Sequence, residues 1–281
     1  MKMFFKLVKY DLKYGSLLSL KKILPVVTLF IFLCFEFRFN SDNFFEVNKI
    51  NPCLTIGDFF LYCFAGMKEY EPSPLNPFVF PVKWMLIYVI LFVSTLSYPY
   101  DNLTEFGQNI LIRSGGRTLW WLSKCVWCVV CVILFFTISF LTIVVFCYVS
   151  GVEMSLTLSG HMPELLEMSN NLSPQLDKLL PAIFILPFIV MIALNLLQIT
   201  LSMILKPLYS FGINLVLMLV SAYYLNPLLI GNYAMPVRSD KMISNGVSFS
   251  SGVFLSLVVI ILSIAVGLLF FRKRNILKEE H

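Results

Sequence analysis

Six long apolar stretches are the feature that most constrains what this chain can fold into. They cover residues 23–39, 82–98, 122–149, 179–205, 208–228 and 253–271. A helix needs about 20 apolar residues to cross a hydrocarbon core of roughly 30 Å, and 58% of the 281 residues are hydrophobic while 13% are charged. Helices satisfy their own backbone groups in lipid. We therefore expect an all-α membrane protein with six transmembrane helices, forming a single domain over residues 1–281.

A seventh apolar segment, residues 54–67, is too short to cross the bilayer and contains Asp58. We interpret it as a re-entrant or interfacial helix on the outer side. Positive charge tests this interpretation, because cytoplasmic segments of membrane proteins carry an excess of Lys and Arg. With six spans and both termini in the cytoplasm, the outer segments contain seven of the 21 basic residues, and the other fourteen lie inside. The seven are Arg38, Lys49, Lys68, Lys83, Lys178, Arg238 and Lys241.

Residues 1–20 have the pattern of an amphipathic helix lying on the membrane. Lys2, Lys6, Lys9 and Lys13 follow one another at spacings of four, three and four, which places them in one stripe of a helix. The other faces carry apolar residues such as Phe4, Phe5, Val8 and Leu12. The stripe predicts an interfacial helix on the cytoplasmic surface, and the same lysines also anchor the topology.

The loop between the second and third predicted spans is the most polar and irregular part of the chain. Asn102 and Glu105 are spaced as a capping box. Gly115 is able to adopt the left-handed conformation that ends a helix, so we expect an amphipathic helix over 102–114. Its apolar stripe is Leu103, Phe106 and Ile110. Its polar side is Glu105, Gln108, Asn109 and Arg113. Such a helix suits contact with a second protein, whereas a plain connector would simply lie on the membrane surface.

The start of the third span is expected to sit at the membrane interface. Arg117 is followed by the adjacent pair Trp120 and Trp121. Indole rings are enriched where lipid meets water. We therefore predict that both rings lie at headgroup level.

Enzyme and metal-site hypotheses find little support in the sequence. Cys125, Cys128 and Cys131 share one helix face, but zinc needs further ligands, and no His or carboxylate lies in that span. Ser159 and His161 lie close together in a loop without a third orienting group. The sequence contains no phosphate-binding motif of the G-x-x-x-x-G-K-[ST] type, so we expect no nucleotide site in this chain. Cys53 and Cys63 both lie outside, where they are able to form a disulfide if their geometry permits.

Uncharged polar residues within the fourth and fifth spans are candidates for a functional role. They are Asn195, Gln198 and Ser202 in the fourth span, and Ser210, Asn214 and Ser221 in the fifth. Such residues either hold helices together by hydrogen bonds or line a translocation path. We favour the first interpretation. Transporters usually carry ionisable residues inside the membrane, and here only Glu36 and Arg38 come near it, at the outer end of the first span.

Three sequence segments resemble a known family. They are "DFFLYCFAG", "PVKWM" and "YDNLTEFGQNILIRSGGRTLWWLSK". Their order is similar to that in permease subunits of ABC-2 type exporters, especially short ones from Gram-positive bacteria. The resemblance covers most of the chain as topology and is residue-specific over about 57–124. The chain departs from the family pattern in its longer, more acidic outer loop at 150–178, and it has no large extracellular domain of the mechanotransmitting type.

The resemblance implies a role for the two amphipathic helices. Residues 1–20 would be the connecting helix, and 102–114 would be the coupling helix that docks on a separate ATPase subunit. Residues 57–66 and the stretch before the sixth span would be extracellular re-entrant helices. The coupling residues would be Glu105, Gly107, Asn109, Ile110, Arg113, Ser114 and Arg117.

The expected function is therefore that of a non-catalytic permease of the bacterial cytoplasmic membrane. It would pair with a second permease copy or a paralogue and with ABC ATPase subunits, which would bind ATP and Mg²⁺. The family resemblance favours an amphipathic or antimicrobial peptide as substrate, with drugs and lipid-linked glycans as alternatives. A channel or secondary transporter working without an ATPase is the alternative class. We expect no cofactor in the chain itself and no nucleic-acid partner.

Overall fold

The structure is a computed structural model that describes residues 2–15, 20–50, 53–73, 77–104, 116–166, 168 and 179–273. The regular elements among these residues are helices, with two isolated β-bridges, so the all-α prediction is confirmed. The helices of the bundle are α2 (Leu20–Asn48), α4 (Val82–Thr95), α7 (Arg117–Val149), α9 (Leu180–Leu205), α10 (Pro207–Tyr223) and α11 (Phe249–Lys273). The shorter elements are α1 (Lys2–Tyr14), α3 (Ile56–Phe64), α5 (Tyr98–Thr104), α8 (Met162–Leu165), η2 (Ile230–Ala234) and η3 (Pro236–Arg238).

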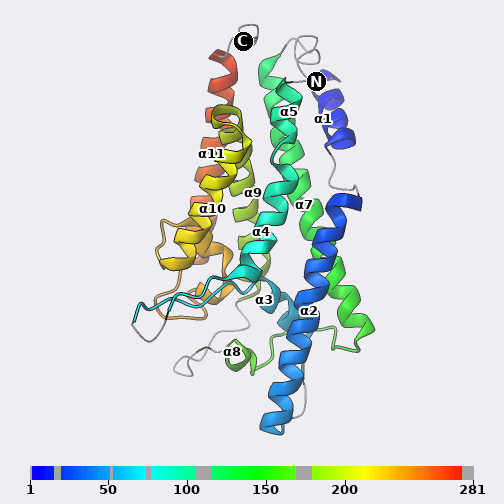
Figure 1. Ribbon diagram of the computed structural model, residues 1–281, viewed down its shortest axis with the longest axis vertical. Helices are drawn as coiled ribbons and strands as arrows, with labels where there is room; N and C mark the ends of the chain where they lie inside the picture. The colour runs from blue at the N-terminus through cyan, green and yellow to red at the C-terminus, as the bar shows by residue number, and fades with distance from the viewer. Residues whose placement is uncertain are drawn as a thin grey trace.

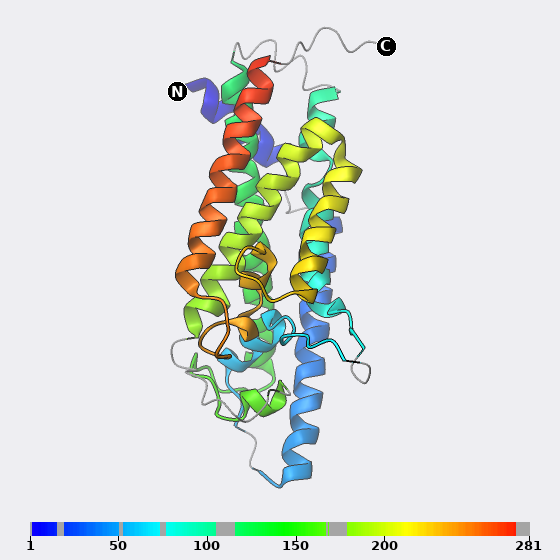
Figure 2. The same ribbon diagram turned by 90° about the vertical axis from the view of Figure 1, so that its left-hand side faces the viewer.

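The bundle helices run along the long axis of the molecule (Figure 1). The amphipathic helix α1 and the C-terminal end of α11 lie at one end, together with α5 and the start of α7. The short elements α3 and α8 lie toward the opposite end, as the view turned by 90° also shows (Figure 2). The two ends of the bundle therefore have different architectures.

Five helical stretches are long and apolar enough to cross a membrane. They are Lys21–Asn48, Val82–Leu103, Arg117–Val149, Leu180–Leu205 and Phe249–Arg272. Each covers one of the predicted spans. At 1.5 Å per residue, the 26 residues of α9 extend about 39 Å, more than the roughly 30 Å of a hydrocarbon core. The chain is a multi-pass membrane protein.

The predicted span at 208–228 forms a shorter helix than expected. Helix α10 has 17 residues, or about 26 Å, and ends at Tyr223 because Tyr224 adopts an extended conformation. The Nδ2 of Asn232 donates to the carbonyl of Tyr224 at 2.9 Å and to that of Asn226 at 3.1 Å. These bonds satisfy carbonyl groups just beyond the helix, where the chain leaves it. Residues 224–228 are therefore not part of the helix.

Helix α9 occupies the middle of the bundle. It contacts α4, α5, α7, α10 and α11. Gly252 of α11 allows close packing against α9, because a Cβ at that position would come within 2.8 Å of the side chain of Leu186 on α9. Small residues allow helix backbones to approach closely, which is how helices associate in membranes.

Helix α3 is a short, buried helix held at both ends, and its nine residues are too few to span a bilayer. At its start, Thr55 and Asp58 form a capping box. The backbone N–H of Ile56 donates to Glu153 at 3.0 Å, and that of Ser159 donates to the Asp58 carboxylate at 2.8 Å. Beyond its C-terminal end, the N–H of Val237 donates to Ala65 at 3.3 Å. The segment 54–67 is thus fixed between two distant parts of the chain.

Candidate functional site

A buried carboxylate, Asp11, joins α1 to the helices on either side of residues 105–115. Its Oδ1 forms an ion pair with the Nζ of Lys124 on α7. The hydroxyl of Ser123 donates to its Oδ2 at 2.8 Å, and that of Tyr98 on α5 donates to its Oδ1 at 3.0 Å. A buried charge is tolerated only when it is paired and its remaining lone pairs are hydrogen-bonded. Asp11 meets both conditions.

Aromatic rings surround the cation of this pair. The Nζ of Lys124 lies 4.7 Å from the centre of the Tyr98 ring and 5.0 Å from that of Trp120. The face of an aromatic ring attracts a cation electrostatically. The ion pair is therefore shielded from solvent by groups that also stabilise its positive half.

A second contact holds the C-terminal end of α1 in place. The indole Nε1 of Trp127 donates to the carbonyl of Gly15 at 2.9 Å, and the rings of Trp127 and Tyr98 lie 4.6 Å apart. A Cβ on Gly15 would come within 2.5 Å of the Trp127 indole nitrogen, so only glycine fits there. Helices α1, α5 and α7 thus meet at one fixed point.

The rings of Trp120 and Trp121 are not exposed to lipid headgroups as the interface interpretation expects, and their depth in the membrane stays a prediction. Both rings are buried inside the bundle, where they pack on Phe271 of α11 with centroid distances of 5.1 and 5.5 Å. The Nε1 of Trp121 donates to the carbonyl of Ile264 at 3.1 Å. Gly267 leaves the space for this ring, because a Cβ there would lie 2.2 Å from it. A groove in α11, rather than lipid headgroups, receives the indole.

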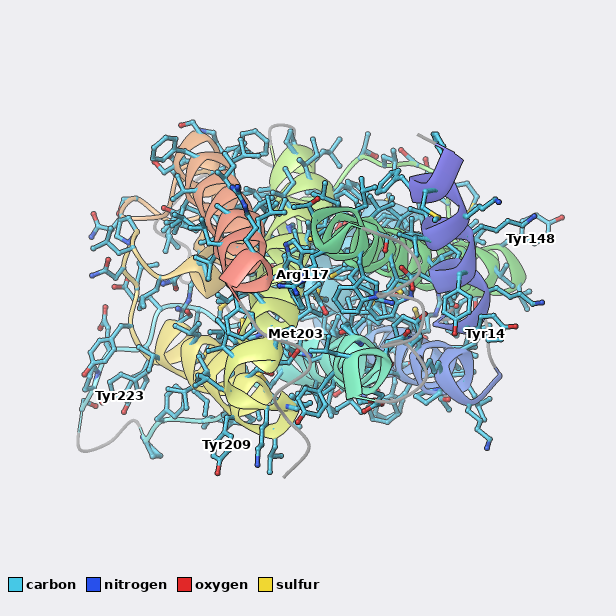
Figure 3. All side chains as sticks on the ribbon, turned by 90° about the horizontal axis from the view of Figure 1, so that it is seen from above. Tyr14, Arg117, Tyr148, Met203, Tyr209 and Tyr223 are labelled. Atoms are coloured by element: carbon cyan, nitrogen blue, oxygen red, sulfur yellow. The ribbon has the colours of Figure 1, made fainter. Side chains whose placement is uncertain are left out.

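Most of the predicted coupling residues lie outside the described part of the chain. These are Glu105, Gly107, Asn109, Ile110, Arg113 and Ser114. The predicted helix start at Asn102 is wrong, because α5 begins at Tyr98 and contains Asn102 within it. Arg117 is the first residue of α7 and is exposed. Figure 3 looks onto this end of the bundle and shows Arg117 toward the middle, whereas Tyr14, the last residue of α1, lies toward the edge.

The amide side chains of α9 and α10 are buried and hydrogen-bonded to neighbouring helices. The Nε2 of Gln198 donates to Phe92 of α4 at 2.8 Å, and the Nδ2 of Asn214 lies 3.3 Å from the Oε1 of Gln198. The hydroxyl of Thr95 on α4 donates to the Oδ1 of Asn195 at 2.8 Å. Ser202 and Ser210 donate to carbonyls of their own helices. This geometry supports a role in holding α4, α9 and α10 together.

Arg238 is a buried cation that sequence reasoning placed only in an outer loop. Its Nε donates to Met67 at 2.9 Å, its two terminal nitrogens donate to the carbonyls of Lys68, Ser221 and Ala222, and one also donates to Asn232. Burial lowers the pKa of Arg238 to about 10, and the charge of Glu69 opposes this shift. All five N–H donors of a guanidinium are used here, so Arg238 has none left for a substrate.

The cysteines provide no metal centre among the residues that the structure describes. No group of three or more His, Cys, Asp or Glu side chains is gathered there as a metal site requires. Cys125, Cys128 and Cys131 are buried in α7, and Cys53 and Cys63 are free thiols. The cysteines of α7 therefore act as small apolar packing residues.

Comparison with known proteins gives one match. A family model described as "Protein of unknown function (DUF2705)" matches residues 31–277. The chain belongs to this family. No curated protein and no solved structure matches it. The part that matches the DUF2705 model includes α5, residues 105–115 and Lys124, and it begins after α1.

Sequence reasoning missed the pairing that organises this end of the DUF2705 chain. Lys124 was expected to be one of several cytoplasmic cations, and Asp11 was not singled out. A signal was present, because Leu7, Asp11 and Gly15 are spaced by four and share the face of α1 that is buried. An acidic residue in that stripe needs a buried cation as its partner.

Proposed function

We propose that this chain is the membrane-spanning permease subunit of an ATP-driven exporter, with residues 105–115 as the segment that contacts a separate ATPase subunit. In this proposal α10 completes a set of six spans, and both termini face the cytoplasm. The protein resides in the bacterial cytoplasmic membrane and works with a second permease copy or a paralogue. The sequence resemblance supplies the class of transporter, and the architecture around Asp11 supports it.

The observation that carries the proposal is the anchoring of both flanks of 105–115. On one side, Tyr98 of α5 donates to Asp11, and on the other side Ser123 and Lys124 of α7 contact the same carboxylate. A simple connector needs no such fixed point. Because α5 and α7 are tied to α1 here, a push on the intervening segment moves three helices together. This is the mechanical requirement for coupling ATP hydrolysis to a change in the bundle.

The positive charge of this end agrees with a cytoplasmic orientation. Lys6, Lys9 and Lys13 of α1 are exposed, and Arg117 and Arg272 lie at the ends of α7 and α11 that share this end of the bundle. Basic residues collect on the cytoplasmic side of membrane proteins. We therefore assign this end to the cytoplasm and the α3 end to the outside. The substrate class that we favour is an amphipathic peptide.

Site-specific photocrosslinking in cells tests the proposal. A photoreactive residue at Gln108 should capture a polypeptide with a G-x-x-x-x-G-K-[ST] motif, identified by mass spectrometry. The same residue at Asn245, an exposed position of the loop between η3 and α11, is the matched control and should capture no such ATPase. If Gln108 captures no ATPase while the chain is inserted in the membrane, the proposal fails. Transport or conductance by the purified chain alone would instead show a channel or secondary transporter.

A further inference from the structure

An apolar groove of about 670 Å³ lies between α2 and the C-terminal half of α7. Helix α2 contributes Val27, Ile31 and Phe35, and the other wall is formed by residues of α7 from Ile138 onward and by Ser150, which follows that helix. Several of the lining side chains are open to the surroundings of the bundle: Phe35 is 62% exposed and Val145 is 59% exposed. In a membrane this hollow faces lipid.

The length of the groove matches one leaflet of the bilayer. Ile138 and Ser150 are twelve residues apart, which is about 18 Å along α7. Half of the hydrocarbon core measures about 15 Å. A single hydrocarbon chain entering from one membrane surface therefore has room to lie along the whole groove.

One end of the groove is apolar and the other carries charge. The edge-to-face contact of Phe35 with Phe146, at 4.9 Å, fixes how the two helices lie side by side. At 100° per residue, Arg38 and Asp42 continue the stripe of α2 that lines the groove, and they follow Phe35 by one and two turns. Ser150, the residue that caps the C-terminal end of α7, follows Phe146 by four residues. The charged mouth is thus at the α3 end of the bundle (Figure 1).

The guanidinium of Arg38, at this charged mouth, has N–H donors that its contact with Asp42 does not use. Arg38 contacts Asp42 through its Nε, at 3.0 Å, and among the described residues no partner of its two terminal nitrogens competes with an anion. Glu36 points away, because it forms an ion pair with Lys83 of α4. A guanidinium recognises the oxygens of a phosphate with two donors at once.

We propose that the groove between α2 and α7 binds one acyl chain of a membrane glycerophospholipid, with the phosphate of that lipid at Arg38. The apolar wall of leaflet length accommodates the chain, and the guanidinium at its polar end accommodates the headgroup. This assignment is independent of the transporter class. It gives the chain a specific lipid site on the face formed by α2 and the second half of α7.

Native mass spectrometry of the purified full-length chain with added phosphatidylglycerol tests the site. Val145→Trp fills the groove and should lower the affinity of the tightest lipid site by about tenfold or more. The matched control is Val126→Trp, which makes the same change at an exposed position of α7 about 28 Å away and should leave lipid binding within twofold. Equal binding by the wild type and both variants would overturn the proposal.

The role of Arg38 is tested separately with two lipids. Arg38→Gln should weaken phosphatidylglycerol binding by about tenfold, as expected for a lost charged hydrogen bond, and should leave diacylglycerol binding unchanged. Lys241→Gln, which removes a cation paired with Asp240 in a loop, is the control and should change neither. Equal loss of both lipids in Arg38→Gln would refute a phosphate contact. Loss of a dimer in Val145→Trp, with no lipid bound to the wild type, would instead assign the groove to a second copy.

Discussion

Asp11 and Lys124 are 113 residues apart in the chain, yet they form an ion pair whose side chains are 2% and 1% exposed. Each charge is stable in this environment because the other is present. The pair joins the first helix of the chain to the start of α7. Its disruption should therefore affect both the stability of the protein and the contact between α1 and α7.

Lys124→Met should strongly destabilise the protein, by about 3–5 kcal/mol, because it leaves the Asp11 carboxylate buried without its cation. The double variant Asp11→Asn with Lys124→Met should recover much of this loss, since no charge remains buried. Thermal unfolding in detergent measures both. Lys9→Met, at an exposed position of α1, is the control and should stay within about 0.5 kcal/mol of the wild type. A double variant no more stable than Lys124→Met would contradict the buried pair.

Arg238→Lys should loosen the α3 end of the bundle. An ammonium has three donors in place of five and cannot reach the carbonyls of Met67 and Ala222 together. Each buried carbonyl left without a donor costs about 1–3 kcal/mol. Hydrogen exchange should accelerate at 65–68 and 221–224. Arg272→Lys, at an exposed position of α11, should leave exchange there unchanged; unaltered protection in Arg238→Lys would speak against the bonding described.

Gln198→Leu should lower the unfolding temperature more than Asn214→Leu does. Gln198 uses both ends of its amide, toward Phe92 and Asn214. The Oδ1 of Asn214 has no partner among the described residues, so its loss relieves a desolvation cost. Melting curves of the two variants, together with dimer recovery, measure the difference. Normal stability in both variants with an altered substrate preference would show that these residues line a path instead.

Asp58 should make stability depend on pH. Burial raises the pKa of its carboxyl above the ordinary value of 3.8, against the hydrogen bonds from Ser159 and Thr55. Because the folded pKa is the higher one, its contribution to stability is complete below about pH 3.8 and is lost as the pH rises through the raised pKa. The stability margin of the wild type over Asp58→Asn should therefore shrink as the pH increases. Asp240→Asn, which removes a carboxylate from a loop ion pair, controls for net charge. A margin that grows with pH would reverse this conclusion.

The bundle helices could be predicted from the sequence because apolar length is a local property. The predicted span 179–205 differs from α9 by one residue at its start, and the predicted span 122–149 ends at the same residue as α7. The early end of α10 could not be predicted in this way. Its last carbonyls are satisfied by Arg238, which lies 16 residues beyond Ala222 in the chain. A contact of that kind leaves no periodic pattern.

The candidate site could be predicted only in part, because its contacts also join residues that are far apart in the sequence. Gln198 and Asn214 stood out because amides are rare in an apolar run. The burial of Trp120 and Trp121 depends on the gap at Gly267, about 145 residues later, and no spacing near the tryptophans reveals it. Lys124 looked like any juxtamembrane cation until Asp11 was brought beside it by the fold.

The single residue Lys206 between α9 and α10 has a consequence for how the protein is made. It links the two helices with φ 79° and ψ 154°, so α10 turns back along α9 at once. Asn214 would be costly alone in lipid, and its nearest partners, Leu194 and Gln198, belong to the helix synthesised just before it. The two helices should therefore enter the bilayer as one hairpin, with the earlier helix receiving the polar side chain of the later one during insertion.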